Sequence, residues 1–140
     1  MLKSLCFWQD QLREAKMFLL GDQVHVNICK NHGFDGVVYV PELSSGEAQF
    51  NYDNQVEWEW EALEKASVIV FWVPRELSTM PGFTTNIEFG HYVRESRVVY
   101  GRPDSAELIR YLDKLYKRFH SESVIFNDLQ ELCNHVTKIL

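Results

Sequence analysis

Apolar positions along the chain alternate between helical and extended spacing. They recur at three- and four-residue steps through Phe7–Leu20, which predicts an amphipathic helix ending at Gly21-Asp22. Asp22–Gly36 is ambiguous, because Val24, Val26 and Ile28 alternate with polar residues as in a short strand. Further strands are expected at Gly36–Pro41, Ala66–Val73, Arg97–Gly101 and Val124–Phe126, and helices at Gln55–Lys65, Thr85–Ser96, Ala106–Phe119 and Asn127–Leu140.

The strand predicted at Ala66–Val73 is almost entirely apolar, as expected of a parallel strand covered on both faces. Helices alternating with strands therefore predict a doubly wound α/β sheet with helices on both faces, in one domain over residues 1–140. Glu42–Asn54 and Pro74–Phe83 read as loops, and Asn127 or Asp128 as the cap of the last helix. The inward faces of the helices are predicted at Val56, Trp60 and Leu63, and at Leu108, Tyr111, Leu112 and Leu115.

Composition excludes some classes of function. The formal charge of −6 argues against a nucleic-acid partner, which requires a basic face. No apolar run approaches a membrane span, and no signal peptide is visible, so we expect a cytoplasmic protein. Three widely spaced cysteines imply no disulfide framework. The spacing of His25, Cys29 and His32 matches no known metal-ligand pattern, so neither a metal nor a cofactor is expected.

The segment Met80–His91 carries the most chemistry. It follows the apolar strand Ala66–Val73, passes through a Pro/Gly turn and enters a helix that carries Glu88. In an open α/β sheet, ligands bind at the carboxyl ends of the strands. Glu88 is therefore either a first-turn acid that interacts with the helix dipole or a reactive group, and its position alone does not decide.

Several motifs occur in order and at compatible spacing from about Val37 to about Leu112. They are Gln55-Val56-Glu57-Trp58-Glu59, Phe71-Trp72-Val73-Pro74-Arg75, Thr84-Thr85-Asn86-Ile87-Glu88-Phe89-Gly90 and Val99-Tyr100-Gly101-Arg102-Pro103. Together they resemble the nucleoside 2-deoxyribosyltransferase-like family. The resemblance implies a flavodoxin-like sheet and cleavage or exchange of the N-glycosidic bond of 2′-deoxynucleosides or their 5′-monophosphates. It also implies an oligomer, a dimer or larger.

The resemblance assigns Glu88 as the nucleophile, followed by Gly90. It assigns Glu59, with Glu57 as the alternative, as the acid that assists proton transfer to the base. Relatives have an Asp at that second position, and the Asp they carry six residues before the nucleophile falls on Gly82 here. The expected substrate-binding residues are Tyr39, Glu57, Trp58, Trp72, Arg75, Thr84, Thr85, Asn86, Gly90 and Arg102.

Simpler roles compete with some of these assignments. Arg75 and Arg102 each follow a strand end, where contact with a 5′-phosphate and solvation of a loop arginine are both reasonable. Thr84 and Thr85 suit a helix N-cap. Core packing competes for Trp58 and Trp72 and is the preferred reading of Trp60.

The N-terminus departs from the family pattern, which begins with a strand and a Gly-containing loop. The segment Leu5–Gln9 resembles the family's first helix instead, so the first strand is expected to be missing or replaced by Val24–Cys29. A transferase or N-glycosidase with a covalent deoxyribosyl-Glu88 intermediate is the leading interpretation. The alternative is a non-catalytic nucleoside- or nucleotide-binding module with a degenerate site.

Overall fold

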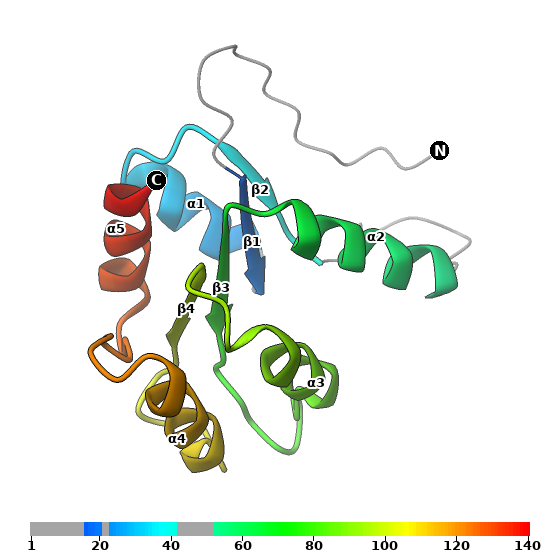
Figure 1. The fold of residues 1–140 in the computed structure, drawn as a ribbon, viewed down its shortest axis with the longest axis vertical. Coiled ribbons are helices and arrows are strands. Elements are labelled where there is room, and N and C mark those ends of the chain that lie inside the picture. Colours follow the sequence, from blue (N-terminus) through cyan, green and yellow to red (C-terminus); the bar gives the residue numbers. More distant parts are fainter. Residues whose placement is uncertain (1–15, 21–22, 42–51) are drawn as a thin grey trace.

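Four parallel strands form the central sheet of the computed structural model, in the order β2-β1-β3-β4 (Figure 1). The structure describes residues 16–20, 23–41 and 52–140. A parallel bridge from Gly101 to Phe126 continues the order by one position beyond β4. This 2-1-3-4-5 order confirms the predicted flavodoxin-like fold. The strands are β1 (Lys16–Leu20), β2 (Val37–Tyr39), β3 (Val68–Trp72) and β4 (Val98–Gly101).

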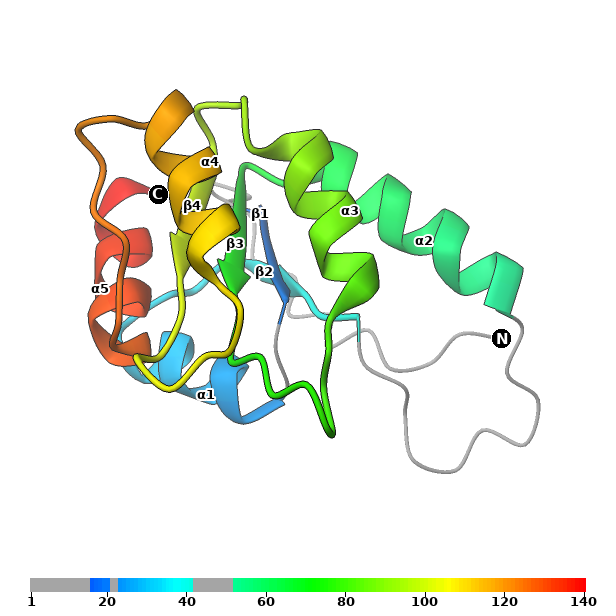
Figure 2. The same cartoon turned by 90° about the horizontal axis from the view of Figure 1, so that it is seen from below.

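Helices cover both faces of the sheet, as Figure 2 shows. They are α1 (Gln23–Asn31), α2 (Tyr52–Lys65), α3 (Phe83–Tyr92), α4 (Arg110–Phe119) and α5 (Leu129–Ile139). β3 is buried along its whole length, and its side chains alternate between two cores. Ile69 and Phe71 pack with α2, α3 and α4, whereas Val68 and Val70 pack with α1 and α5.

The prediction of a missing or replaced first strand was wrong. Lys16–Leu20, predicted as the end of a helix over Phe7–Leu20, forms β1 at the centre of the sheet; the earlier part of that helix lies outside the described residues. Phe18 is in register with Tyr39 of β2 and with Ile69 of β3. Val24–Cys29, the proposed replacement, lies in α1. Pairing with two neighbours satisfies the backbone groups of β1, and this non-local gain outweighs the helical spacing.

Other boundaries and faces differ from expectation. α2 begins at Tyr52, within the predicted loop, whose residues 42–51 lie outside the described ones. Trp60 is 54% exposed, because the face of α2 that packs on the core carries Ala62 and Leu63 instead. Leu108 and Tyr111 are also exposed, since α4 begins only at Arg110 and Leu108 lies in a left-handed turn with φ of 47°. The predicted strand Val124–Phe126 reduces to the single bridge at Phe126.

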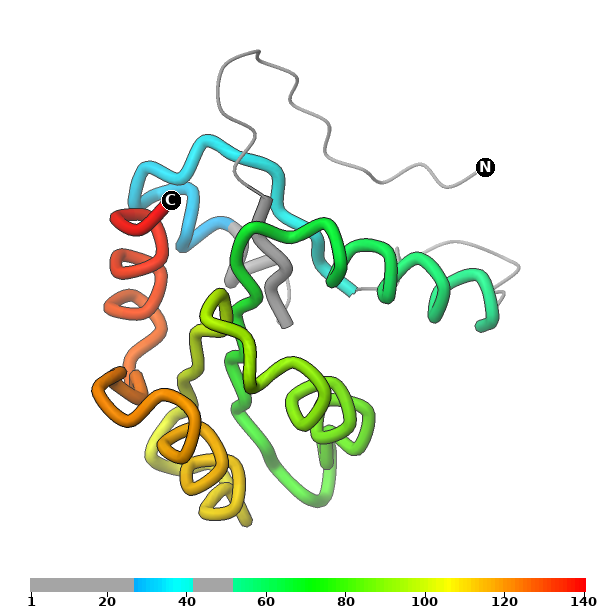
Figure 3. Tube along the Cα trace, in the orientation of Figure 1, coloured from blue at the N-terminus to red at the C-terminus, as the bar shows by residue number. Residues whose placement is uncertain are grey.

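The end of the chain is fixed by a cap and by a disulfide. The Asp128 side chain accepts a hydrogen bond from the Glu131 amide at 2.9 Å, so Asp128 is the N-cap of α5. Contrary to expectation, Cys29 of α1 and Cys133 of α5, both buried, form a disulfide. Figure 3 shows these two helices side by side, although they lie far apart in the sequence. Spacing along the chain could not reveal a pair that only the fold brings together.

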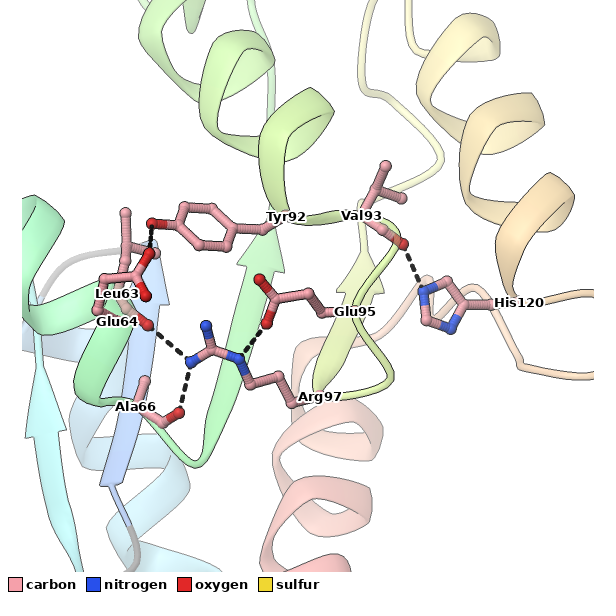
Figure 4. Close-up of polar contacts among 8 residues, drawn as sticks. All are labelled: Leu63, Glu64, Ala66, Tyr92, Val93, Glu95, Arg97 and His120. Carbon is pink, nitrogen blue, oxygen red and sulfur yellow. Dashed lines mark hydrogen bonds and ion pairs between the residues drawn. The ribbon is translucent and has the colours of Figure 1, made fainter.

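Arg97 fixes the C-terminal end of α2 (Figure 4). Its Nη1 donates hydrogen bonds to the carbonyl oxygens of Leu63 at 2.7 Å and Ala66 at 2.6 Å, and its Nε pairs with Glu95. The last carbonyls of a helix have no partner within the helix, so a cation there satisfies them. The contact ties α2, which carries two of the predicted site residues, to the start of β4. Within the described ranges, none of the helices is long and apolar enough to span a bilayer.

Candidate functional site

The site lies where the strand order reverses, between β1 and β3. In such sheets the loops at the carboxyl ends of the strands on either side of this point form the ligand crevice. The loop after β3 leads into α3, which carries Glu88. Phe89, the next residue, packs its ring against Phe71 at 5.1 Å and Tyr100 at 5.0 Å between centroids. These contacts hold α3 against the sheet and turn Glu88 inward, where its side chain is only 9% exposed.

Glu88 is not a first-turn acid. The sequence predicted a helix beginning at Thr85, but α3 begins at Phe83, and its first turn contains no acidic residue. The macrodipole acts mainly within the first turn of a helix. The dipole-partner interpretation therefore fails, and so does the expected stabilisation of a Glu88 anion by the helix start. Burial of Glu88 has to be explained in another way.

The Glu88 carboxyl is coupled to Glu59. Burial, as the larger cause, and the negative charge of Glu59, as the smaller one, together raise the pKa of Glu88 from 4.5 to about 7. Glu59 lies on α2 and is half-buried, while Glu57, the alternative, is exposed. The structure thus brings Glu88 and Glu59 into electrostatic contact across two helices.

Gln55 was not predicted as a candidate site residue, but its side chain contacts Glu59. Its amide Nε2 donates a hydrogen bond of 2.7 Å to Oε1 of Glu59, one turn later on α2. The i,i+4 spacing of a Gln and a Glu was the available signal. A donor on one Glu59 oxygen restrains the orientation of that carboxyl. Gln55 therefore helps to position Glu59 on α2.

Two predicted aromatic residues, on β2 and α2, contact each other. Tyr39, at the end of β2, meets Trp58 of α2 edge to face, with ring centroids 6.3 Å apart. Trp58 directly precedes Glu59 in the chain. Trp72 lies elsewhere: it is buried in the core shared with α1 and α5, on the face of the sheet opposite α3. Core packing therefore accounts for the position of Trp72, and its contact with a ligand stays a prediction.

A second group of predicted residues surrounds the start of α3. The N-cap is Gly82, so Thr84 and Thr85 lie inside the first turn and the prediction that they cap the helix was wrong. Arg75 is buried rather than solvated, and it donates hydrogen bonds to Asn86 Oδ1 and to the Leu108 carbonyl. The Arg75 carbonyl accepts a hydrogen bond from the Glu107 amide at 3.0 Å. Arg75 therefore joins the loop after β3, the start of α3 and the loop before α4.

The remaining predicted residues show fewer links to this site. Gly90 is exposed, and a Cβ at its position would meet nothing within 4 Å. Arg102 pairs with Asp113 at 3.0 Å and Asp104 at 3.1 Å, and the hydrogen bond to Asp113 is the main cause of its raised pKa. Tyr100 also donates to Asp113, at 2.9 Å. Arg102 therefore has a structural role at the end of β4, and its contact with substrate stays a prediction.

The described residues hold no group of three or more His, Cys, Asp or Glu side chains placed to bind a metal. Cys29, one of the three residues considered for such a site, is bonded to Cys133 instead. What the structure offers is a carboxyl pair, an aromatic pair, and a buried arginine at the start of the same helix that carries Glu88.

Fold and candidate site together define a flavodoxin-like domain in which the buried Glu88 is coupled to the half-buried Glu59. A family model described as nucleoside 2-deoxyribosyltransferase like matches residues 8–106, and the chain belongs to this family. The match begins upstream of β1, so the family's first strand is included in it. A search of curated proteins found none that matches the chain.

The Glu88→Gln variant is expected to remove a pH dependence of stability. A carboxyl whose pKa rises on folding binds more protons folded than unfolded, so wild-type stability falls as the pH rises from 4.5 to about 7. Relative to wild type, Glu88→Gln should gain at most about 3 kcal/mol between pH 5 and pH 8 in urea unfolding. Exposed Glu122→Gln is the control. A constant difference between Glu88→Gln and wild type contradicts the burial of an ionisable Glu88.

Proposed function

We propose that the protein cleaves or transfers the N-glycosidic bond of 2′-deoxynucleosides or their 5′-monophosphates through a covalent deoxyribosyl-Glu88 intermediate. Membership of the nucleoside 2-deoxyribosyltransferase-like family supports a nucleoside ligand. The observation that carries the proposal is the buried Glu88 coupled to Glu59. Glycoside cleavage with a covalent intermediate uses such a pair, one acid as nucleophile and one as proton donor.

In the first step, an ionised Glu88 oxygen bonds to the anomeric carbon while the bond from that carbon to the base nitrogen breaks. The bonding electrons go to the base, and the proton of Glu59 is transferred to it. In the second step, Glu59 accepts a proton from water or from an acceptor base, which attacks the anomeric carbon and releases Glu88. The reaction therefore needs one proton on the pair, located on Glu59. A raised pKa holds the proton on Glu88 below about pH 7, so the ionised nucleophile forms as the pH rises through that value.

Tyr39 and Trp58 are the residues that we propose hold the planar base. Trp58 directly precedes Glu59, the proposed proton donor to the base, and its ring contacts Tyr39 edge to face. Stacking of a base on an aromatic ring is favourable for any base, because every base has a π-face. We therefore assign these two residues to the base and the start of α3 to the sugar side of the substrate.

The alternative, a non-catalytic binding module, relied on an incomplete site. Its main support was the expected loss of the first strand, and β1 is present with Gly21 directly after it in the sequence. The Gly at position 82, where transferases of the family are expected to carry an Asp, still favours the alternative. Ligand binding without turnover that is unchanged in Glu88→Gln would establish the binding module.

We also propose a homo-oligomer. The resemblance implies one, and the exposed Phe83 and Ile87 lie one turn apart on α3, an apolar surface suited to contact between copies. Light scattering at micromolar concentration should show a dimer or a larger species, and a sharp monomer would contradict the proposal. We also propose a cytoplasmic location. The Cys29–Cys133 disulfide is evidence against this location, because cytoplasmic thiols are kept reduced.

Variants of the acid pair test the proposed reaction. Each deoxynucleoside and its 5′-monophosphate is incubated with the protein, with and without a free acceptor base, and the products are separated by chromatography. Glu88→Gln should lower base release or exchange by at least about 10³-fold, because it removes the nucleophile. Glu59→Gln should lower it by about 10²-fold or more, because it removes the proton donor.

Glu61→Gln is the matched control, since Glu61 lies on the same helix but is exposed and pairs with Lys65. It should retain wild-type rates. Full activity in a folded Glu88→Gln protein would rule out the covalent mechanism.

A further inference from the structure

Arg75 is a buried cation whose contacts are with neutral oxygens. Its side chain is 6% exposed, and its two terminal nitrogens donate to the Leu108 carbonyl and to the Asn86 amide oxygen. Among the described residues, the ion pairs within 4.0 Å do not include Arg75. Burying a charge without a counter-charge is costly, and proteins generally pair such groups. The surroundings of Arg75 therefore favour an added anion.

One donor of Arg75 has no hydrogen-bond partner and lies beside the start of α3. This is Nε, which is fully buried. A Cβ added at Gly82 would lie 3.9 Å from Arg75 Nε and 3.6 Å from Thr85 Oγ1. The space next to Gly82, into which any other residue would place its side chain, is thus bordered by two polar groups able to donate a hydrogen bond. Buried donors without partners are rare in native structures and require an explanation.

The helix start contributes further donors at the same place. α3 has ten residues, and its N-cap Gly82 supplies no side-chain hydrogen bond to the first-turn amides. Gly82 has φ of 65°, in the left-handed region that glycine adopts without strain. Free amides at the positive end of a helix dipole bind anions. Gly82 therefore adds no side chain that would cap the amides or fill the space beside Arg75 Nε.

We propose that the start of α3 and Arg75 form a binding site for an oxyanion, and that its occupant is the 5′-phosphate of a nucleoside monophosphate. This inference rests on the proposed function. It narrows the proposed substrates from deoxynucleosides or their monophosphates to the monophosphates alone. Thr85 and Glu88 lie three residues apart and so share a face of α3. A phosphate at Thr85 therefore places the attached sugar towards Glu88.

Arg75 Nε is buried, so an anion reaches it only when the side chains around it move. A bound phosphate would then receive hydrogen bonds from Nε, from the Thr85 hydroxyl and from first-turn amides. The guanidinium supplies the counter-charge without leaving Asn86 and Leu108. The site uses Arg75 as a fixed donor rather than as a mobile surface cation.

Equilibrium titration of the Glu88→Gln protein, which separates binding from turnover, tests the proposal. The ligands are the four deoxynucleosides, their 5′-monophosphates and inorganic phosphate. At least one monophosphate should bind about tenfold or more tightly than its nucleoside, as expected for hydrogen bonds to a charged group. Inorganic phosphate should compete with the monophosphate. Equal affinity for nucleoside and monophosphate would overturn the proposal.

Three variants, each made in the Glu88→Gln background, locate the site. Arg75→Lys keeps the charge but loses Nε, Thr85→Val keeps the shape but loses the hydroxyl, and Gly82→Ala fills the space between them. Each should reduce the preference for monophosphate while affinity for the nucleoside stays within about twofold, a change of under 0.5 kcal/mol. Thr79→Val, in the same loop and exposed, is the control and should retain the preference. If Arg75→Lys does not fold, Thr85→Val and Gly82→Ala decide the outcome.

The remaining outcomes separate the two proposals. An unchanged preference in folded Thr85→Val and Gly82→Ala proteins overturns the site. Inorganic phosphate that binds together with a nucleoside overturns the assignment to the substrate's own phosphate. Turnover of nucleosides by the wild type with no preference for monophosphates defeats this inference and leaves the proposed function intact. Phosphate-dependent binding with no base release supports this inference and contradicts the proposed function.

Discussion

The burial of β3 on both faces is the constraint on which the rest of the structure depends. Val68–Trp72 pairs with β1 on one side and β4 on the other, and its side chains divide between two cores. A strand enclosed in this way has to be followed by a chain that emerges at the carboxyl edge of the sheet. Arg75, the Gly82 turn and α3 are placed there as a consequence. The loop and helix that carry the candidate site residues Arg75 and Glu88 therefore follow directly from this buried strand.

α2 and α3 pack against the same face of that sheet, and this packing gives the Glu88 carboxyl an unusual environment. α2 is fixed at its C-terminal end by Arg97, and α3 by the ring of Phe89 between Phe71 and Tyr100. With both helices in place, the Glu88 carboxyl loses water and faces the charge of Glu59. Two charged carboxylates there are unfavourable. The fold therefore keeps Glu88 protonated up to about pH 7, well above the ordinary range of a carboxyl.

The sequence predicted the parts of the fold that have strong local signals. The all-apolar β3, β4, α2, α3 and the Asp128 cap of α5 occur where they were expected, apart from shifts of a few residues at some helix ends. It failed at β1, because Lys16–Leu20 continues the three- and four-residue spacing of the preceding segment and a short apolar run does not distinguish strand from helix. Only the pairing of this segment with β2 and β3 makes it a strand rather than a helix. In the site, motifs found Glu88 and Glu59, whereas the burial of Arg75 and the Cys29–Cys133 pair depend on segments distant in sequence.

Glu88 is a buried acid whose pKa is raised by burial and by the charge of Glu59. Carbon-13 NMR titration of the side-chain carboxyls, with the Glu88 signal assigned from the Glu88→Gln spectrum, measures this directly. The account predicts that Glu88 titrates near pH 7. It also predicts a lower midpoint in Glu59→Gln, by less than the whole shift, because burial is the larger cause. A Glu88 midpoint near 4.5 that does not respond to Glu59→Gln would contradict the account.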